Sequence, residues 1–220
     1  MSLDTIIEQY REAFRKHGNS PSAVFWPKGR QQLRFSRLTS HFPRDGFSVL
    51  DFGCGLAHLH RFLDVRHNNF SYTGVDLVPD FITECRKNHP DASFTLINDF
   101  REVTGEYDYV ILSGVFNMLY SPDRSTHLLM VRDTLKHLFG LTRIALSCDF
   151  MTDRVDFQGE GAFHMNEPEL IDMTQRHLSP RYTIDHSYMP YEFALTVYRD
   201  QRIARPDNVY LGIQDADSPH

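Results

Sequence analysis

The chain has 220 residues, of which 41% are hydrophobic and 24% are charged, enough apolar material for one globular domain of ordinary size. Its formal net charge of −6 argues against a nucleic-acid substrate, because nucleic-acid binders usually carry a basic surface. The three cysteines, Cys54, Cys85 and Cys148, are widely spaced, so we expect reduced thiols and neither a disulfide framework nor a zinc ribbon.

Targeting and metal-binding signals are weak in this sequence. The first residues, MSLDTIIEQYREAF, place acids where a signal peptide needs a cationic start, and no apolar run approaches the ~20 residues of a membrane span. His58 and His60 are two residues apart, so a helix would not turn them toward one metal ion. We therefore expect a cytoplasmic protein with no membrane partner and no metal.

The periodicity of apolar residues predicts the elements along the chain. Residues 3–16 carry apolar side chains on one helical face, namely Leu3, Ile6, Ile7, Tyr10, Ala13 and Phe14. A second helix is predicted near 28–41, and strands and helices then alternate. The predicted strands are 47–52, 71–77, 92–99, 107–114, 141–150, 181–188 and 191–199, and the predicted helices between them are 56–65, 79–89, 122–139 and 166–178.

This alternation predicts an α/β fold, with a doubly wound, Rossmann-like sheet of seven strands and helices on both faces. The last two strands are joined too tightly for a crossover, so they must pair as an antiparallel hairpin. We expect residues 1–200 to form a single domain, with a helical cap at 1–45 and the core at 46–200. Residues 201–220 are predicted to be a polar tail.

The stretch VLDFGCGLAH, residues 49–58, is the first signal of a ligand site. Asp51 ends a buried strand, and Gly53 and Gly55 allow a backbone turn that a ligand can approach closely. Asp76 ends the next strand, 21 residues after Gly55, a spacing that suits a carboxylate bound to a ribose diol. A dinucleotide site, with the pattern G-x-G-x-x-G, would carry its third glycine where His58 stands. An acid before the first glycine favours a cationic ligand such as S-adenosylmethionine over a pyrophosphate.

Four blocks, VLDFGCGLA, YTGVDLVPDFITECRKNHP, FTLINDF and YDYVILSGVF, resemble those of class I S-adenosylmethionine-dependent methyltransferases in order and spacing. The resemblance implies that S-adenosylmethionine is the cofactor and S-adenosylhomocysteine the product. It places Asp51, Gly53, Cys54, Gly55 and Ser113 along the methionine part, Asp76 on the ribose, and Leu77, Asp99 and Phe100 at the adenine. Helices at the N-terminus of related enzymes cap the cofactor, so Arg34 is expected to reach its carboxylate.

The resemblance implies methyl transfer to a small-molecule acceptor, mainly by positioning it beside the activated methyl group. Candidate side chains follow the carboxyl ends of the strands. We expect Asn117 and His164 to be catalytic, and Tyr120, Tyr188, Tyr191 and Glu192 to contact the acceptor. Each has an ordinary structural alternative, such as a surface histidine for His164 and hairpin packing for the two later tyrosines.

Three other functions share parts of this pattern. An aminopropyl transferase, or another enzyme that uses an S-adenosyl ligand, would carry the same glycine turn and Asp76. A protein that binds the cofactor without turnover would keep all four blocks. A nicotinamide oxidoreductase is disfavoured by the absence of the third glycine. The sequence predicts neither the methyl acceptor nor the oligomeric state.

Overall fold

A computed structural model describes residues 3–25, 29–121 and 123–200. Its elements alternate along the chain much as the periodicity predicts. The order is α1 Leu3–His17, η1 Pro21–Val24, α2 Arg30–Leu38, β1 Phe47–Phe52, α3 His58–Asp64, β2 Phe70–Asp76, α4 Pro79–Asn88, β3 Ser93–Leu96, η2 Phe100–Glu102, β4 Tyr107–Leu112, α5 Arg124–Gly140, β5 Thr142–Thr152, β6 His164–Met165, α6 Glu167–His177, β7 Tyr182–Asp185 and β8 Glu192–Tyr198.

One central sheet joins these strands in the order β3-β2-β1-β4-β5-β8-β7, with the short β6 paired to β5. The first five strands are parallel, and β8 runs antiparallel to both β5 and β7. The predicted Rossmann-like sheet and its terminal hairpin are therefore confirmed. The strand order reverses between β1 and β4, and in open α/β sheets a ligand site lies at the carboxyl ends of the strands beside such a reversal.

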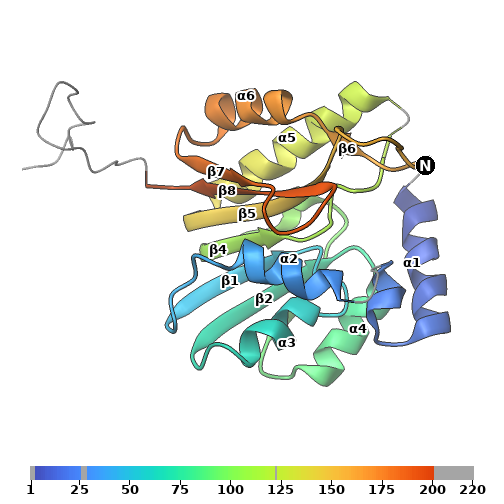
Figure 1. Ribbon diagram of the computed structural model, residues 1–220. Helices are drawn as coiled ribbons and strands as arrows, with labels where there is room; N and C mark the ends of the chain where they lie inside the picture. The colour runs from blue at the N-terminus through green and yellow to red at the C-terminus, as the bar shows by residue number, and fades with distance from the viewer. Residues whose placement is uncertain (1–2, 26–28, 122, 201–220) are drawn as a thin grey trace, which may run out of the picture.

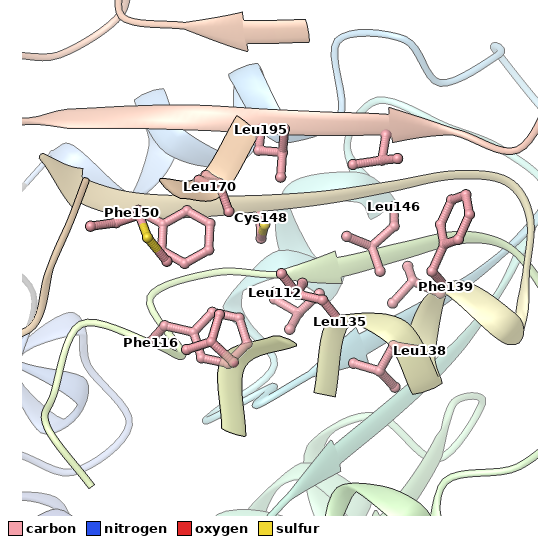
Figure 2. Packing of buried hydrophobic residues seen from close by; sticks show 14 of the residues in the cluster. Leu112, Phe116, Leu135, Leu138, Phe139, Leu146, Cys148, Phe150, Leu170 and Leu195 are labelled. Carbon is pink, nitrogen blue, oxygen red and sulfur yellow. The ribbon is translucent and has the colours of Figure 1, made fainter. Parts of the chain in front are cut away.

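Helices cover both faces of the sheet, and α1 stands at the end where the parallel strands finish (Figure 1). On one face α2, α3 and α4 enclose a core that includes Leu38, Leu63 and Ile82. On the other face α5 and α6 pack on β4, β5 and β8, where the rings of Phe116 and Phe150 stack 5.5 Å apart (Figure 2). These two cores hold the strand ends in fixed positions.

The structure differs from the predicted elements at several places. Helix α2 ends at Leu38, and its buried Phe35 and Leu38 pack into the core on the sheet face. The short strand β6 falls inside what the sequence predicts as a loop, and it adds an edge of two residues to β5. Strand β3 stops at Leu96, three residues earlier than predicted. The predicted tail, residues 201–220, lies outside the described residues.

Candidate functional site

The turn after β1 adopts a left-handed backbone at three alternate positions. Gly53, Gly55 and Ala57 have φ angles of 74°, 53° and 54°. The N–H groups of Gly53 and Cys54 both donate to the carbonyl of Val75, 2.9 and 3.0 Å away, which ties the turn to the end of β2. A Cβ added to Gly53 would lie 2.8 Å from Cγ2 of Val115, so this position has space only for glycine.

Asp76 lies at the end of β2 and is fixed by the backbone. Its Oδ2 accepts from the N–H of Gly55 at 2.8 Å, and its Oδ1 accepts from the N–H of Val78 at 2.9 Å. Burial raises the pKa of Asp76, and these backbone hydrogen bonds act in the opposite direction. A carboxylate has about four lone-pair sites and the backbone of Leu77 also hydrogen-bonds Asp76, so Asp76 is able to accept at least one further hydrogen bond from a ligand.

Asp51 is a second buried acid, at the end of the adjacent strand. It is 2% exposed and accepts a hydrogen bond from the hydroxyl of Tyr72. Burial raises the pKa of Asp51 to about 7, although the Tyr72 hydrogen bond opposes this shift. A buried carboxyl of this kind favours a positive charge beside it, because a cation restores the stability of its ionised form.

The glycine turn and both acids line one cavity, here called the turn cavity, of about 130 Å³. Its walls come from the ends of β1, β2 and β4 and from the helices α1, η1, α2, α3 and α4. They are Ile6, Ile7, Tyr10, Val24, Gln31, Phe35, Asp51, Phe52, Gly53, Cys54, Gly55, Leu56, His58, Asp76, Leu77, Val78, Phe81, Ile97, Ser113, Gly114, Val115 and Tyr120. Seven of the ten residues that the sequence assigns to the cofactor are among them.

The other three, Arg34, Asp99 and Phe100, are absent from the lining of the turn cavity. Asp99 caps η2 and binds Arg101, whose Nε lies 2.6 Å from its carboxylate; this hydrogen bond lowers the pKa of Asp99 to about 2. Phe100 packs its ring 5.7 Å from that of His137. At this end of the cavity the structure instead presents Ile97, the first residue after β3.

Arg34 is fully buried, as an inward-facing residue of α2. Its guanidinium hydrogen-bonds Glu192, with Nε 3.1 Å from Oε2, and the same nitrogen lies 3.1 Å from Asp149 Oδ2. The pKa of Tyr188 is raised by burial and by these two carboxylates. We call the set Arg34, Asp149, Tyr188 and Glu192 the buried charge cluster. The sequence predicts that Arg34 reaches the cofactor carboxylate, whereas in the structure its guanidinium is paired with Asp149 on β5 and Glu192 on β8.

The buried charge cluster reaches the turn cavity through Asp149. Oδ1 of Asp149 accepts from the N–H of Gly114 at 2.8 Å, and Gly114 lines the turn cavity. The amide of Asn117 also donates to Asp149 and lowers its pKa, while burial raises that pKa more strongly. The carboxylate of Asp149 therefore holds the backbone at Gly114 together with the side chain of Asn117.

A second cavity, here called the outer cavity, adjoins the first and measures about 720 Å³. Tyr10, Val24 and Gly114 line both cavities. The remaining walls of the outer cavity are Gln9, Glu12, Ala13, Lys16, His17, Phe25, Arg30, Asn117, Met118, Met151 and Glu192. Its volume falls within the ~300–1,000 Å³ typical of small-molecule sites.

The structure separates the residues that the sequence assigns to catalysis, Asn117 and His164, and to the acceptor, Tyr120, Tyr188, Tyr191 and Glu192. Asn117 and Glu192 line the outer cavity, and Tyr120 lines the turn cavity. His164 lies outside both: Nδ1 is 2.7 Å from the carbonyl oxygen of Thr152, on the strand paired with β6. Tyr188 belongs to the buried charge cluster, and Tyr191 is 59% exposed with a left-handed φ of 68°. Neither of these tyrosines lines the turn cavity or the outer cavity.

The sequence predicts a helical cap at residues 1–45 but names no side chain of α1 as part of the site. Ile6, Ile7 and Tyr10 close the turn cavity, and the pKa of Tyr10 is raised to about 12 by burial and by the nearby charge of Asp76. The apolar stripe along residues 3–16 is visible in the sequence, but the sequence does not show which of its side chains close the cavity. Within the described residues, no helix is both long and apolar enough to cross a membrane.

Known proteins match this chain in sequence and in structure. The family model for the methyltransferase domain matches residues 49–137. A Mycobacterium tuberculosis protein that carries the name of a methyltransferase, Rv1506c, is 27% identical over 158 residues, or 70% of this chain and 93% of its own.

Two solved structures share the fold. A TehB-like S-adenosylmethionine-dependent methyltransferase from Corynebacterium glutamicum has a TM-score of 0.57 at 16% identity, covering 89% of this chain and 98% of its own. DhpI, solved in complex with S-adenosylhomocysteine, has a TM-score of 0.60 at 16% identity, covering 89% and 97%. Residues 49–137 thus match a methyltransferase domain model, and the chain is similar in fold to S-adenosylmethionine-dependent methyltransferases.

Proposed function

We propose that this protein is an enzyme that transfers a methyl group from S-adenosylmethionine to a small-molecule acceptor in the outer cavity. The observation that carries the proposal is the junction of the two cavities at Gly114. One side of this junction holds the glycine turn and Asp76, which suit a nucleoside. The other side opens into a larger space with mostly apolar walls, which suits an organic molecule.

The residues of the turn cavity fit the cofactor chemically. The carboxylate of Asp76 would accept hydrogen bonds from the ribose hydroxyls, and Leu77 and Ile97 would cover the adenine. The turn at Gly53–Gly55 exposes backbone without a Cβ, and Asp51 offers a buried negative charge to a cation. When bound, S-adenosylmethionine supplies a methyl group that is already activated by its sulfonium.

The turn cavity is narrow because α1 lies across it. Its ~130 Å³ is below the ~300 Å³ at which small-molecule sites usually begin. Ile6, Ile7 and Tyr10 provide the covering side chains, and they make few polar contacts with the turn: the hydroxyl of Tyr10 is 3.7 Å from the sulfur of Met118. We therefore expect α1 to move outward when the nucleoside enters and to pack against it afterwards.

The chain's own contribution to methyl transfer would be to bind, orient and exclude water. Tyr10 and Val24 stand at the junction and would shield the reacting atoms from solvent. Asn117 and Glu192 would hold the acceptor. His164 is directed to the backbone of Thr152, so it supplies an anchor for β6 rather than a contact in either cavity.

Calorimetry with S-adenosylhomocysteine and mass spectrometry of an acceptor screen test this proposal together. We expect micromolar binding of the nucleoside and, with a productive acceptor, release of S-adenosylhomocysteine. Release of methylthioadenosine would instead indicate aminopropyl transfer. Absence of nucleoside binding would overturn the proposal.

A further inference from the structure

The polar side chains of the outer cavity include an exposed set and a shielded set. Glu12, Lys16, His17 and Arg30 belong to α1 and to the start of α2 and are exposed, with both signs of charge represented. Three side chains are less exposed: Gln9 of α1 and Asn117 are half-buried, and Glu192 is only 6% exposed. We call Asn117, which contacts the buried charge cluster, and Glu192, which belongs to it, the shielded set. Since exposed charges are screened by water, the two shielded side chains should decide which ligand group is preferred.

Both shielded side chains present hydrogen-bond acceptors. The hydrogen bonds from Arg34 to Glu192 end on Oε2, so Oε1 takes no part in them. Asn117 donates its amide to Asp149, and within the described residues its buried Oδ1 accepts no hydrogen bond. A buried amide oxygen without a donor is uncommon, and a ligand N–H or O–H group would satisfy it.

The charges of the buried charge cluster, which lies next to Asn117 and Glu192, also favour a hydrogen-bond donor on the ligand. The buried charge cluster sets one guanidinium, Arg34, against two carboxylates, Asp149 and Glu192. Burial raises the pKa of both carboxyls, and the attraction of Arg34 lowers them only in part. A ligand cation or N–H group would relieve this excess negative charge, whereas a ligand carboxylate would add to it.

The rest of the outer cavity has apolar walls. Tyr10 and Phe25 lie with their rings 5.0 Å apart, and Met118 and Met151 face the same space. Aromatic rings and methionine side chains pack well on a flat apolar body, and methionine adapts to irregular shapes. Met151 is paired with Glu192 across the β5–β8 ladder, so apolar wall and carboxylate adjoin.

We propose that Asn117 and Glu192 select an acceptor that carries an amine on an apolar, ring-containing body. This inference rests on the proposed function, because it assigns the outer cavity to the methyl acceptor. Arg34 and Asp149 hold the two selecting side chains in place. The exposed cations on the rim suggest a carboxylate-bearing acceptor as the competing outcome.

Three small molecules that share a phenyl ring and differ in their polar group test the inference. They are added to the intact protein saturated with S-adenosylhomocysteine, which prevents turnover. They are 2-phenylethylamine, 2-phenylethanol and phenylacetate, and calorimetry gives the affinity of each. We expect the amine to bind at least about tenfold tighter than the carboxylate, which is the size of one charge-assisted hydrogen bond. Glu192→Gln and Asn117→Leu should each reduce the affinity for the amine, and Glu192→Gln should also remove most of the preference for it.

Glu169→Gln is a matched control, because Glu169 lies on α6 and pairs with Arg124 at the surface. It should leave all three affinities unchanged. The Asn117→Leu variant and the probe series on the unmodified protein keep the test decisive if Glu192→Gln unfolds. Absence of nucleoside binding would overturn the proposed function itself. A protein that binds the nucleoside but shows no preference for the amine, or whose preference survives both variants, overturns the assignment of Asn117 and Glu192 alone.

Discussion

Removal of the Asp76 carboxylate should weaken nucleoside binding more than any other single truncation at the glycine turn. Asp76 accepts from the backbone at Gly55 and Val78, and it lines the turn cavity. In Asp76→Ala a bound ribose loses its charged acceptor, and such a hydrogen bond contributes about 1.5–3 kcal/mol. Affinity for S-adenosylhomocysteine should therefore fall by about 10- to 150-fold.

The same substitution should lower stability, for a separate reason. Two buried N–H groups lose their acceptor, and each unpaired donor costs about 1–3 kcal/mol. Asp76→Asn should be milder for folding, because its carbonyl oxygen is able to keep one of the two backbone hydrogen bonds. It should still lose most of the affinity, since its amide group offers a donor where the ribose needs an acceptor.

Calorimetry measures the affinity, and urea unfolding shows that each variant is folded during the measurement. Asp172→Asn is the matched control, because Asp172 lies on α6 with its side chain 60% exposed. Its affinity should stay within about twofold of the unmodified protein, as expected for an exposed charge that is far from the ligand. A folded Asp76→Ala protein with unchanged affinity would refute the assignment of Asp76 to the ribose.

Four further predictions concern the turn, the two buried charge sites and α1. Gly53→Ala should lose more stability in urea than Gly46→Ala, since both have φ near +75° but only the former places a Cβ against Val115; equal losses would contradict this. Burial raises the pKa of Asp51 to about 7, so the folded protein favours the protonated carboxyl. The resulting stabilisation is complete below about pH 4 and is lost as the pH rises through 7. The free energy of unfolding in urea should thus be lower at pH 8 than at pH 5 for the unmodified protein, and Asp51→Asn should lack this loss. The same change with pH in both proteins would contradict the prediction. Arg34→Ala should reduce the unfolding free energy by about 3–5 kcal/mol, because it leaves two carboxylates buried without a cation; a loss below about 1 kcal/mol would show that they are protonated. Hydrogen exchange in α1 should slow when S-adenosylhomocysteine binds, and unchanged exchange would show that α1 does not cover the ligand.

The sequence predicts the strand ends and the glycine turn because short-range patterns determine both. Asp51 and Asp76 each end an apolar run that alternates with helices, so the sheet topology brings them to one edge. The glycines at 53 and 55 mark left-handed backbone directly. These features need no knowledge of distant partners.

Side-chain partners across the fold are not encoded by local pattern. Arg34 shows a helical face but meets Glu192, which lies 158 residues away. Asp99 follows β3 by three residues, and its neighbour Arg101 takes its carboxylate. His164 lies in a polar stretch that folds as a strand because β5 extends to Thr152. In each case a tertiary contact, visible only in the structure, determines where the side chain points.

A crystal structure of the protein soaked with S-adenosylhomocysteine tests the central claim most directly. The account predicts electron density for the nucleoside in the turn cavity, with the ribose hydroxyls at hydrogen-bonding distance from Asp76 and the sulfur directed past Gly114 toward the outer cavity. A cavity without the nucleoside, or a ribose that does not contact Asp76, would contradict it.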